Sequence, residues 1–476
     1  MKRPNVLLIT CDQLRRDALG IYGNDVVRTP TIDRVFQNGF RFTNMFAANP
    51  VCAPNRGAIA TGRWPRVNGL ARNGSILPES EITMMEVFRQ YGYRTYGVGK
   101  MHFAPQREEK YDSETGDGAV DPQPPPHRLP HYGFERCVLT EDNRGGPYAE
   151  YLKRHGYHPW AGIDNWSPGC QHCCEVSPFP EEHHQTTWIT EHSLDFLRHH
   201  DRNRPFFMWV SYVHPHHPFT PPAPYDEMYD PARMPLPVYR EGEHRARGQN
   251  YQDRFRGRVH SHENADFSAF PAERWQRIKA FYYGMISQID ANVERLVRCL
   301  KESNQFDNTI IVFTSDHGEL LGDHHLMFKS FPFDCVTAVP FLVRIPEGPN
   351  ELHSVDTLCR SLEIMPTLLE LAELPVPEHV NGRSLKRHIE AEPAELFDSI
   401  LIEHNSHQTV RTRTYRLTVH HDDPIGELYD LRRDPDNLEN VWAHPQYAGV
   451  RDALLCRLVR HLYEVMDPRF RPVAPC

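Results

Sequence analysis

Five short runs of β-branched and aromatic residues recur along the chain, and segments with the spacing of amphipathic helices separate them. Each run is short and largely apolar, which is typical of a strand buried on both faces. Strands that alternate with helices predict an α/β fold, with a large mixed, mostly parallel sheet sandwiched by helices. The runs are residues 6–10, 94–98, 206–213, 308–314 and 339–345.

The predicted helices have apolar residues at helical spacing and recognisable ends. Thr31 caps a predicted helix over residues 32–37, and Gly92 ends one over residues 82–91. Longer amphipathic helices are predicted over residues 186–199, 271–302 and 354–374.

The pattern changes after residue 390, where strands no longer alternate with long helices. We therefore expect a large α/β domain over residues 1–390 and a smaller C-terminal α+β subdomain over residues 391–476. In the subdomain, short antiparallel strands are predicted over residues 399–403, 409–420 and 427–431, followed by a helix over residues 449–465.

Composition excludes several classes of protein. The mean hydropathy is −0.61 and no run approaches the roughly twenty apolar residues of a membrane span, so no membrane association is expected. The net charge of −10 argues against nucleic acid as a partner. The apolar run after Lys2 and Arg3 is too short for a signal peptide, so a cytoplasmic location is expected. In that compartment the 11 cysteines are expected to be free thiols.

Polar side chains follow four of the predicted strands, at the point where each strand ends. The carboxyl ends of parallel strands meet at one edge of a sheet, which is where α/β proteins bind ligands. Asp12, Asp316 and His317 therefore predict a divalent-metal site with open positions for a substrate oxygen. For any one of them, an ordinary polar residue leaving a sheet stays the alternative. The full set is Asp12 and Gln13, Lys100 and His102, His214, and Asp316 and His317.

A reactive cysteine is predicted within the segment NPVCAPNRGAIATGR, residues 49–63. Pro54 suits the first turn of a helix, which places Cys52 at the start of that helix. Arg56 lies four residues further on, on the same helical face. A thiol at a helix N-terminus beside a cation has a lowered pKa and is reactive, whereas a buried structural thiol is the alternative.

The segment Cys-Ala-Pro-Asn-Arg, followed after four residues by Thr-Gly-Arg, resembles the signature of the type I sulfatases, a family of the alkaline phosphatase superfamily. The resemblance extends along essentially the whole chain. It implies an alkaline phosphatase-like fold and a hydrolase that cleaves sulfate esters into an alcohol and inorganic sulfate. The other matching positions are Asp12, Lys100, His102, His214, Asp316, His317, Lys329 and the closing segment GELYDLRRDPDNLEN.

The resemblance also implies a modified nucleophile and a metal. Cys52 would be oxidised to formylglycine (3-oxoalanine) by a formylglycine-generating enzyme, and the modified residue would contact a metal held by Asp12, Asp316 and His317. Cys11 replaces the first Asp of the family's common Asp-Asp pair, and His317 often corresponds to Asn in the family. With one carboxylate fewer, Ca²⁺ is still expected, and Mn²⁺ or Zn²⁺ are the alternatives.

Catalytic roles follow from the same resemblance. Arg56 and Lys100 would hold the nucleophile and its oxyanion. His214 and Lys329 would stabilise or protonate the departing alcohol, and His102 would take the proton whose removal releases sulfate. Asn55, Gly57 and Ala58 depart from the residues common in the family.

The substrate is expected to be a sulfated small molecule or saccharide, and a homo-oligomer is left open. Gln13, Asn73 and His217 are candidate substrate contacts, as is His216, although steric lining would explain the last three nearly as well. One alternative function is a phosphonate monoester or phosphodiester hydrolase that uses the same site. That branch has Tyr and Thr where this chain has Lys100 and His102, which favours sulfate. A second alternative is a catalytically inactive relative that binds sulfated glycans.

Two long segments lack helical or strand periodicity, residues 104–181 and 236–268, and loops of that length tend to be functional. In the first, a second metal site that binds zinc is weighed against a solvent-facing or packed loop, which is preferred. In the second, the arginines of residues 240–262 are weighed as a polyanion contact against a solvated surface loop. The metal candidates are Cys170, His172, Cys173 and Cys174.

Overall fold

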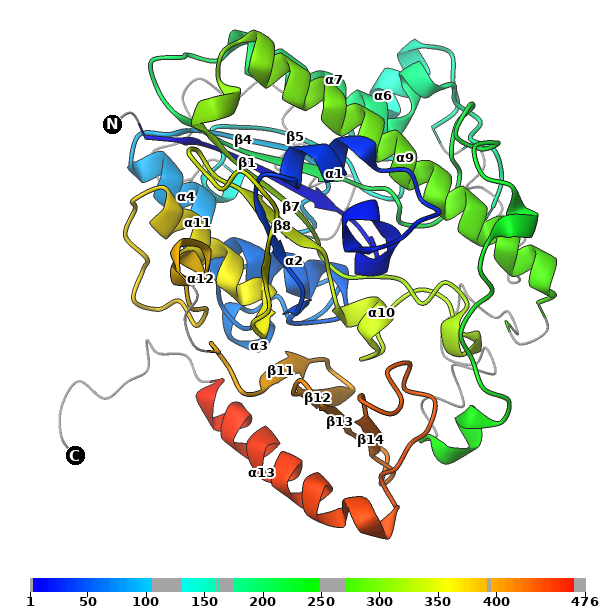
Figure 1. Cartoon of the computed structure of the whole chain (residues 1–476). Helices are drawn as coiled ribbons and strands as arrows, with labels where there is room; N and C mark the ends of the chain where they lie inside the picture. Colours follow the sequence, from blue (N-terminus) through cyan, green and yellow to red (C-terminus); the bar gives the residue numbers. More distant parts are fainter. Residues whose placement is uncertain are drawn as a thin grey trace, which may run out of the picture.

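An eight-stranded sheet forms the centre of the protein in a computed structural model (Figure 1). The structure describes residues 3–104, 131–159, 161, 174–248, 267, 270–391 and 395–465. The strand order is β5-β4-β6-β1-β7-β8-β2-β9. The strands are β1 (Asn5–Cys11), β2 (Phe40–Phe42), β4 (Arg94–Gly99), β5 (Arg136–Leu139), β6 (Phe206–Tyr212), β7 (Thr309–Ser315), β8 (Phe341–Arg344) and β9 (His353–Val355).

The sheet is mixed and mostly parallel, which confirms the predicted fold class. Strand β1 runs parallel to β6 and β7, and β4 runs parallel to β5 and β6. Strand β8 is antiparallel to both of its neighbours, β7 and β2. A separate short pair joins β3 (Met45–Phe46) to β10 (Cys359–Arg360).

Helices cover both faces of the sheet because alternate residues of each buried strand point to opposite sides. In β1, Leu7 and Ile9 pack into one apolar cluster, and Val6 and Leu8 pack into another. Figure 1 shows α1 (Pro30–Phe36), α6 (Pro147–Arg154), α7 (Gln185–His199) and α9 (Ala272–Glu302) above the sheet. Below it lie α2 (Cys52–Thr61), α3 (Pro65–Asn68), α4 (Met84–Gln90), α11 (Ile364–Leu371) and α12 (Lys386–Glu390), while α10 (Asp334–Thr337) flanks the sheet.

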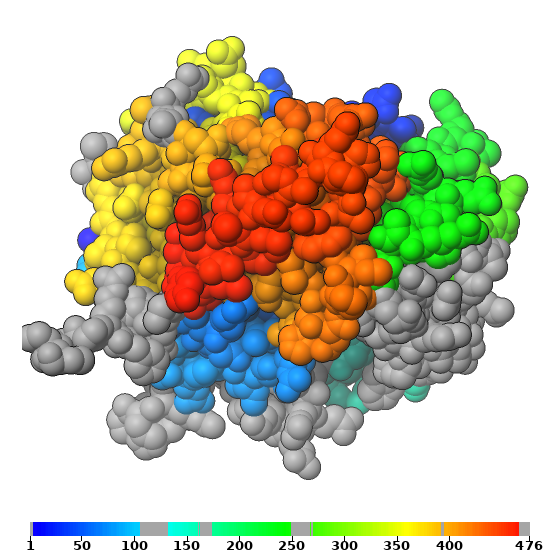
Figure 2. Space-filling view, turned by 90° about the horizontal axis from the view of Figure 1, so that it is seen from below, coloured from blue at the N-terminus to red at the C-terminus, as the bar shows by residue number. Residues whose placement is uncertain are grey.

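A four-stranded antiparallel sheet and one helix form the C-terminal part, as predicted. In Figure 2 this part, coloured orange to red, covers the centre of the face shown. Leu417 and Leu458 share a buried cluster with Trp64 and Leu362, so it packs directly on the larger unit. The division at residue 390 stays a prediction. The elements are β11 (Ile400–Glu403), β12 (His407–Arg411), β13 (Tyr415–His420), β14 (Glu427–Asp430) and α13 (Ala448–Glu464).

Three predicted elements are wrong in detail. Thr31 lies inside α1, which begins at Pro30, rather than at its cap. The helix predicted over residues 354–374 is two short strands, a 3₁₀ turn and then α11. The strand predicted over residues 409–420 is a hairpin of β12 and β13.

None of the helices in the described residues has the length and apolarity that crossing a membrane requires.

Candidate active site

The carboxyl ends of four adjacent strands converge, as the strand-end argument predicts. Asp12 follows β1, Asp316 follows β7 and Lys100 follows β4, and all three side chains are buried. The ammonium of Lys100 lies 2.6 Å from Oδ2 of Asp12. These groups are therefore close enough to act on one small ligand.

Four buried side chains form a cluster suited to a metal ion. The ligand atoms of Asp12, Cys52, Asp316 and His317 all lie within 4.8 Å of one another. His317 Nε2 is 3.6 Å from Asp12 Oδ1 and 3.1 Å from Cys52 Sγ. The other ring nitrogen of His317 donates to the carbonyl of Gly318 at 2.8 Å, which leaves Nε2 free to act as a ligand. The structure thus brings together the complete predicted metal set.

Cys52 is the first residue of α2, and its thiol is only 1% exposed. From the next turn, Arg56 Nε donates to Asp316 Oδ2 at 2.7 Å and Arg56 Nη1 donates to Ser211 at 2.8 Å. Arg56 also lies 3.6 Å from Asp12. The predicted placement of Cys52 and Arg56 on one helical face is therefore confirmed.

The residues of α2 that depart from the family pattern have structural explanations. Asn55 Oδ1 accepts the Ala48 N–H at 2.9 Å, and its amide donates to the carbonyl of Asp316. A Cβ at Gly57 would lie 3.0 Å from Leu70 Cδ2, so a small residue is favoured there. Asn55 thereby links helix α2 to the residue pair that follows β7.

Asn73 contacts the same helix at its start. Its Oδ1 accepts the N–H of Ala53 at 3.0 Å, which satisfies one of the free amides of the first turn. This bond gives Asn73 a capping role, and its predicted contact with substrate stays a prediction.

Cations surround the Cys52 thiol. Lys329 Nζ lies 2.9 Å from the sulfur, and His102 also forms a hydrogen bond to it. Burial alone would raise the pKa of the Cys52 thiol, but the charges of Lys329, Lys100 and His317 outweigh burial and hold that pKa well below its usual value. An anionic group at this position is thus strongly stabilised.

Two carboxylates that the sequence analysis missed complete the wall of the site. Asp142 Oδ2 lies 3.3 Å from Lys100 Nζ and 3.6 Å from His216 Nε2. Burial would raise the pKa of Asp142, but Lys100, His216 and His102 hold it well below its usual value. Glu141 accepts the backbone N–H of His102 at 3.0 Å. Both residues follow the end of β5, a strand that is not predicted from the sequence, and their place at a strand end is the signal that could have identified them.

The predicted role of His214 needs a correction, because the structure places His216 against Lys329 instead. The distance from His216 Nε2 to Lys329 Nζ is 2.8 Å. His214 bonds to Thr186 at 2.9 Å and stacks on His184, with ring centroids 4.6 Å apart. Burial, reinforced by His184, holds the pKa of His214 well below its usual value, so its ring is a poor proton donor.

Gln13 and His217, both predicted to contact substrate, lie beside Lys329. Gln13 Oε1 accepts from Lys329 Nζ at 3.0 Å, and Gln13 Nε2 lies 3.2 Å from His217 Nδ1. The two residues therefore line the site, and their contact with substrate stays a prediction.

The candidate second metal site and the arginine-rich segment of residues 240–262 fall largely outside the described residues. Cys170, His172 and Cys173 lie there, and so do Arg254, Arg256 and Arg258. Cys174 is buried and pairs with Phe219 in a β-bridge.

Arg247, within the arginine-rich segment, is not a solvated surface residue. Its guanidinium carbon lies 4.7 Å from the ring centroid of Phe333 and 5.7 Å from that of Tyr429. It also donates to Glu243 at 3.0 Å. For Arg247, the surface-loop interpretation is therefore wrong.

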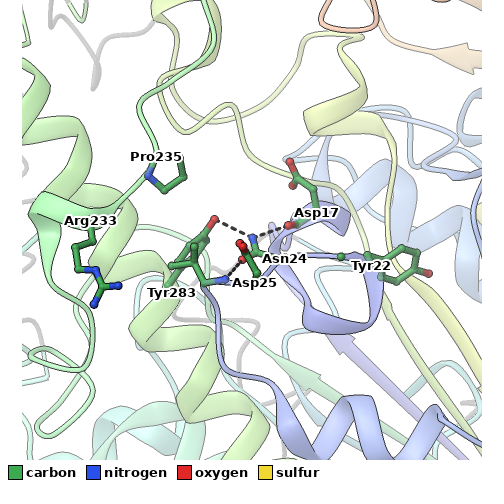
Figure 3. Close-up of a pocket in the computed structure, with 9 residues that line it drawn as sticks. Asp17, Tyr22, Asn24, Asp25, Arg233, Pro235 and Tyr283 are labelled. Atoms are coloured by element: carbon green, nitrogen blue, oxygen red, sulfur yellow. Dashed lines mark hydrogen bonds between the residues drawn. The ribbon is translucent and has the colours of Figure 1, made fainter.

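A surface pocket of about 380 Å³ lies apart from these residues (Figure 3). Its wall is ordered by Asn24, which donates to the carbonyl of Asp17 at 2.8 Å and to the hydroxyl of Tyr283 at 3.0 Å. The carboxylate of Asp17 is already paired with Arg15 at 2.6 Å. None of the predicted site residues lines this pocket.

The fold and the cluster at its strand ends define a hydrolase of the alkaline phosphatase superfamily. The family model described as sulfatase matches residues 4–374, and one described as N-sulphoglucosamine sulphohydrolase, C-terminal, matches residues 322–464. The chain belongs to the sulfatase family and is a sulfatase enzyme.

Curated and solved relatives agree with this assignment. An arylsulfatase of Clostridium perfringens is 30% identical, with 97% of this chain and 94% of the relative covered. An N-acetylglucosamine-6-O-sulfatase of Bacteroides thetaiotaomicron is 25% identical, with 98% and 88% covered. The structure of a phosphonate monoester hydrolase of Agrobacterium radiobacter is similar with a TM-score of 0.81 at 26% identity, with 98% and 96% covered. The alkaline phosphatase-like fold is thus confirmed.

Proposed function

We propose that this protein hydrolyses sulfate esters with a formylglycine nucleophile formed from Cys52 and one divalent metal ion. The observation that carries the proposal is the arrangement around the Cys52 sulfur. Metal-type donors lie within 4.8 Å of it, and the ammonium of Lys329 lies 2.9 Å away. A sulfate ester is an anion, so a nucleophile that attacks it needs this kind of charge neutralisation.

The donor set fits a divalent metal. Asp12 and Asp316 offer carboxylate oxygens and His317 offers Nε2, in a buried cluster whose histidine is already oriented by Gly318. A bound metal supplies Lewis-acid polarisation of the ester oxygens and favours a deprotonated nucleophile. The carboxylate oxygens suit Ca²⁺, and the nitrogen of His317 leaves Mn²⁺ or Zn²⁺ as the alternatives.

Position 52 also fits the modified residue. Formylglycine in its hydrated form supplies a hydroxyl nucleophile, whose oxygen would stand where the sulfur atom now lies. The atoms aimed at that sulfur, Lys329 Nζ and His317 Nε2, suit an oxygen that carries negative charge. A formylglycine-generating enzyme is the implied partner for maturation.

Other residues of the chain bind the ester, protonate the departing alcohol and accept the proton whose loss releases sulfate. Arg56 and Lys100 are buried cations, and they hold the anionic ester in place without needing to reorganise. Lys329 and His216 lie 2.8 Å apart and hold the proton that the departing alcohol takes. His102, which bonds to Cys52, accepts the proton whose loss releases sulfate.

A sulfated aryl or saccharide alcohol is the proposed substrate. The relatives at 30% and 25% identity are named as an arylsulfatase and an N-acetylglucosamine-6-O-sulfatase, which supports both forms.

Hydrolysis of phosphonate monoesters is the second candidate. It is favoured by the TM-score of 0.81 to the phosphonate monoester hydrolase. It is disfavoured by Lys100 and His102, because the phosphonate branch resembles this chain but has Tyr and Thr at these two positions.

The test compares the turnover of an aryl sulfate, sulfated monosaccharides and an aryl phosphonate by protein coexpressed with a formylglycine-generating enzyme. We expect sulfate turnover to dominate and mass spectrometry to show formylglycine at position 52. Cys52→Ala should abolish turnover while the fold, followed by circular dichroism, is retained. Phosphonate turnover that exceeds sulfate turnover by orders of magnitude would establish the second candidate. An unmodified thiol with no turnover of either ester, but with binding of sulfated glycans, would establish the inactive relative.

Metal removal gives an independent prediction. Exhaustive chelation should abolish turnover, and it should lower the thermal unfolding midpoint because a ligand that binds only the folded state stabilises that state. Adding back Ca²⁺, Mn²⁺ or Zn²⁺ separately, with the restored rate as readout, identifies the metal. Full activity at a metal content far below one ion per chain would contradict the proposal.

A further inference from the structure

The loop that carries Lys329 has an unusual backbone. Between β7 and α10, five residues other than glycine have positive φ angles, and two of them, Phe328 and Ser330, flank Lys329 directly. Each such conformation is unfavourable for a residue with a Cβ and persists only where surrounding contacts impose it. The five are Leu321 (51°), His324 (59°), His325 (56°), Phe328 (73°) and Ser330 (76°).

Two backbone hydrogen bonds hold the residues on either side of Lys329. The N–H of Phe328 donates to Oε1 of Glu319. The N–H of Ser330 donates at 3.1 Å to the carbonyl of Pro50, two residues before Cys52. The main chain at Lys329 is thereby fixed between a buried carboxylate and the segment that leads into the nucleophile helix.

Glu319 reaches Lys329 by a second route, through side chains. Its Oε2 accepts from Gln13 Nε2, and Gln13 Oε1 accepts from Lys329 Nζ at 3.0 Å. Oε1 of Glu319 also accepts the N–H of Leu321 at 2.9 Å. Both carboxylate oxygens of Glu319, which is 0% exposed, thus serve as acceptors, and together they take three N–H donors.

We propose that Glu319 is a positioning residue that fixes the ammonium of Lys329 against the side chain of residue 52. The inference rests on the proposed function for the role of Lys329. Glu319 acts through the backbone at Phe328 and through the amide of Gln13, and it does not touch the reacting atoms itself.

A double-mutant cycle with Lys329→Ala tests the proposal, measured on whichever ester the unaltered enzyme turns over. A misplaced catalytic group costs about 10²-fold in rate, so we expect Glu319→Ala to lower kcat to that extent while KM changes by less than about threefold. In the Lys329→Ala background the same substitution should cost less than about twofold, because a residue that acts only through Lys329 has nothing left to position. Equal losses in both backgrounds would overturn the proposal.

Glu319→Gln retains volume and serves if the alanine variant fails to fold. The new amide would donate towards Gln13, whose flipped amide would then direct its N–H groups at Lys329, so a loss of kcat is again expected. Adding Gln13→Glu restores an acceptor for both partners and should recover most of the loss. A double variant no more active than Glu319→Gln would overturn the side-chain route.

Asp290 supplies a matched control. It is also a buried carboxylate that accepts backbone N–H groups, from Thr31 and Ile32, at 2.8–3.1 Å. Asp290→Asn should lower stability and leave kcat within about twofold.

Amide hydrogen exchange gives a readout that needs no substrate. Glu319→Ala should speed exchange in the peptide with Leu321 and Phe328, whereas Asp290→Asn should speed it only around Thr31 and Ile32. Unchanged exchange at Leu321 and Phe328 would overturn the proposal. Because this result does not depend on turnover, a failure of the proposed function can be told apart from a failure of this inference.

Discussion

His216 and His214 are two residues apart in the segment that follows β6, yet their surroundings differ. His216 contacts Lys329, whereas His214 is held by Thr186 and stacked on His184. Loss of a general acid costs about 10²-fold or more, so His216→Ala should lower kcat to that extent.

His214→Ala is the matched control for this prediction. It should cost less than about tenfold in kcat, because it removes a packed neutral ring rather than a proton donor. Both rates are measured on an aryl sulfate, with circular dichroism as the check on folding. Equal losses for the two variants would contradict the assignment.

For single residues, the sequence predicts the position of a site residue wherever that residue directly follows a strand. Asp12, Lys100 and Asp316 are placed by the strand itself, because its direction determines where the next side chain lies. His214 and His216 stand in an irregular segment, where the backbone path decides which ring turns towards Lys329. The alternation of apolar and polar residues predicts strands, but it does not predict the backbone path of an irregular segment.

Helix α2 depends on Asn55, which is 0% exposed and bonds to the backbone of Ala48 and Asp316. Ala48 retains a second acceptor in Ser361 at 2.9 Å, but removal of the Asn55 amide takes the donor from the Asp316 carbonyl and the acceptor from the Ser361 hydroxyl. We expect Asn55→Ala to lower the free energy of unfolding by about 2 kcal/mol, the usual cost of an unsatisfied buried group.

Urea unfolding measures this loss, with Asn73→Ala as the control on the same helix. Asn73 is exposed, and loss of its cap should cost about 1 kcal/mol. A smaller loss for Asn55→Ala than for Asn73→Ala would contradict the structural role given to Asn55.

Long elements are predicted well because their periodicity extends over many residues, as in α9 and α7. The hairpin of β12 and β13 is missed because its turn, Thr412 to Thr414, has no glycine, proline or asparagine. The turn is instead closed by the side chain of Thr412, which accepts the N–H groups of Thr414 and Tyr415 at 3.2 and 2.9 Å. Strands β9 and β10 have two or three residues each, too few for any pattern to show.

On the scale of the whole molecule, buried charges join the C-terminal sheet to the larger unit. The guanidinium carbon of Arg416, on β13, lies 4.5 Å from the ring centroid of Phe333, which is close to the loop that carries Lys329. Glu427 on β14 accepts from Arg416 at 3.1 Å, from His420 at 2.9 Å and from Tyr429 at 2.9 Å. Burial would raise the pKa of Glu427, but the bond from His420 and the charge of Arg416 outweigh it and lower the pKa to about 2.

This network predicts an acid-sensitive stability. An unfolded glutamate has a pKa of about 4.3, so the folded state binds fewer protons below that value, and the contribution of Glu427 falls as pH drops from about 4.3 towards about 2. Glu427→Gln should cost about 3 kcal/mol at neutral pH, because it leaves Arg416 buried without its partner. Urea unfolding of both proteins between about pH 6 and about pH 3 checks this. A difference that stays constant over that range would contradict it.

The deep burial of Cys52 has a consequence for the order of events during synthesis. The thiol is enclosed by His317 and Lys329, and 265 residues separate Cys52 from His317. At about 5–20 residues per second, the ribosome needs roughly 13–53 s to make that intervening chain. For nearly all of this interval β7 has not been made, so Cys52 is not yet enclosed. If Cys52 is oxidised as proposed, its position early in the chain sets a time window for that oxidation.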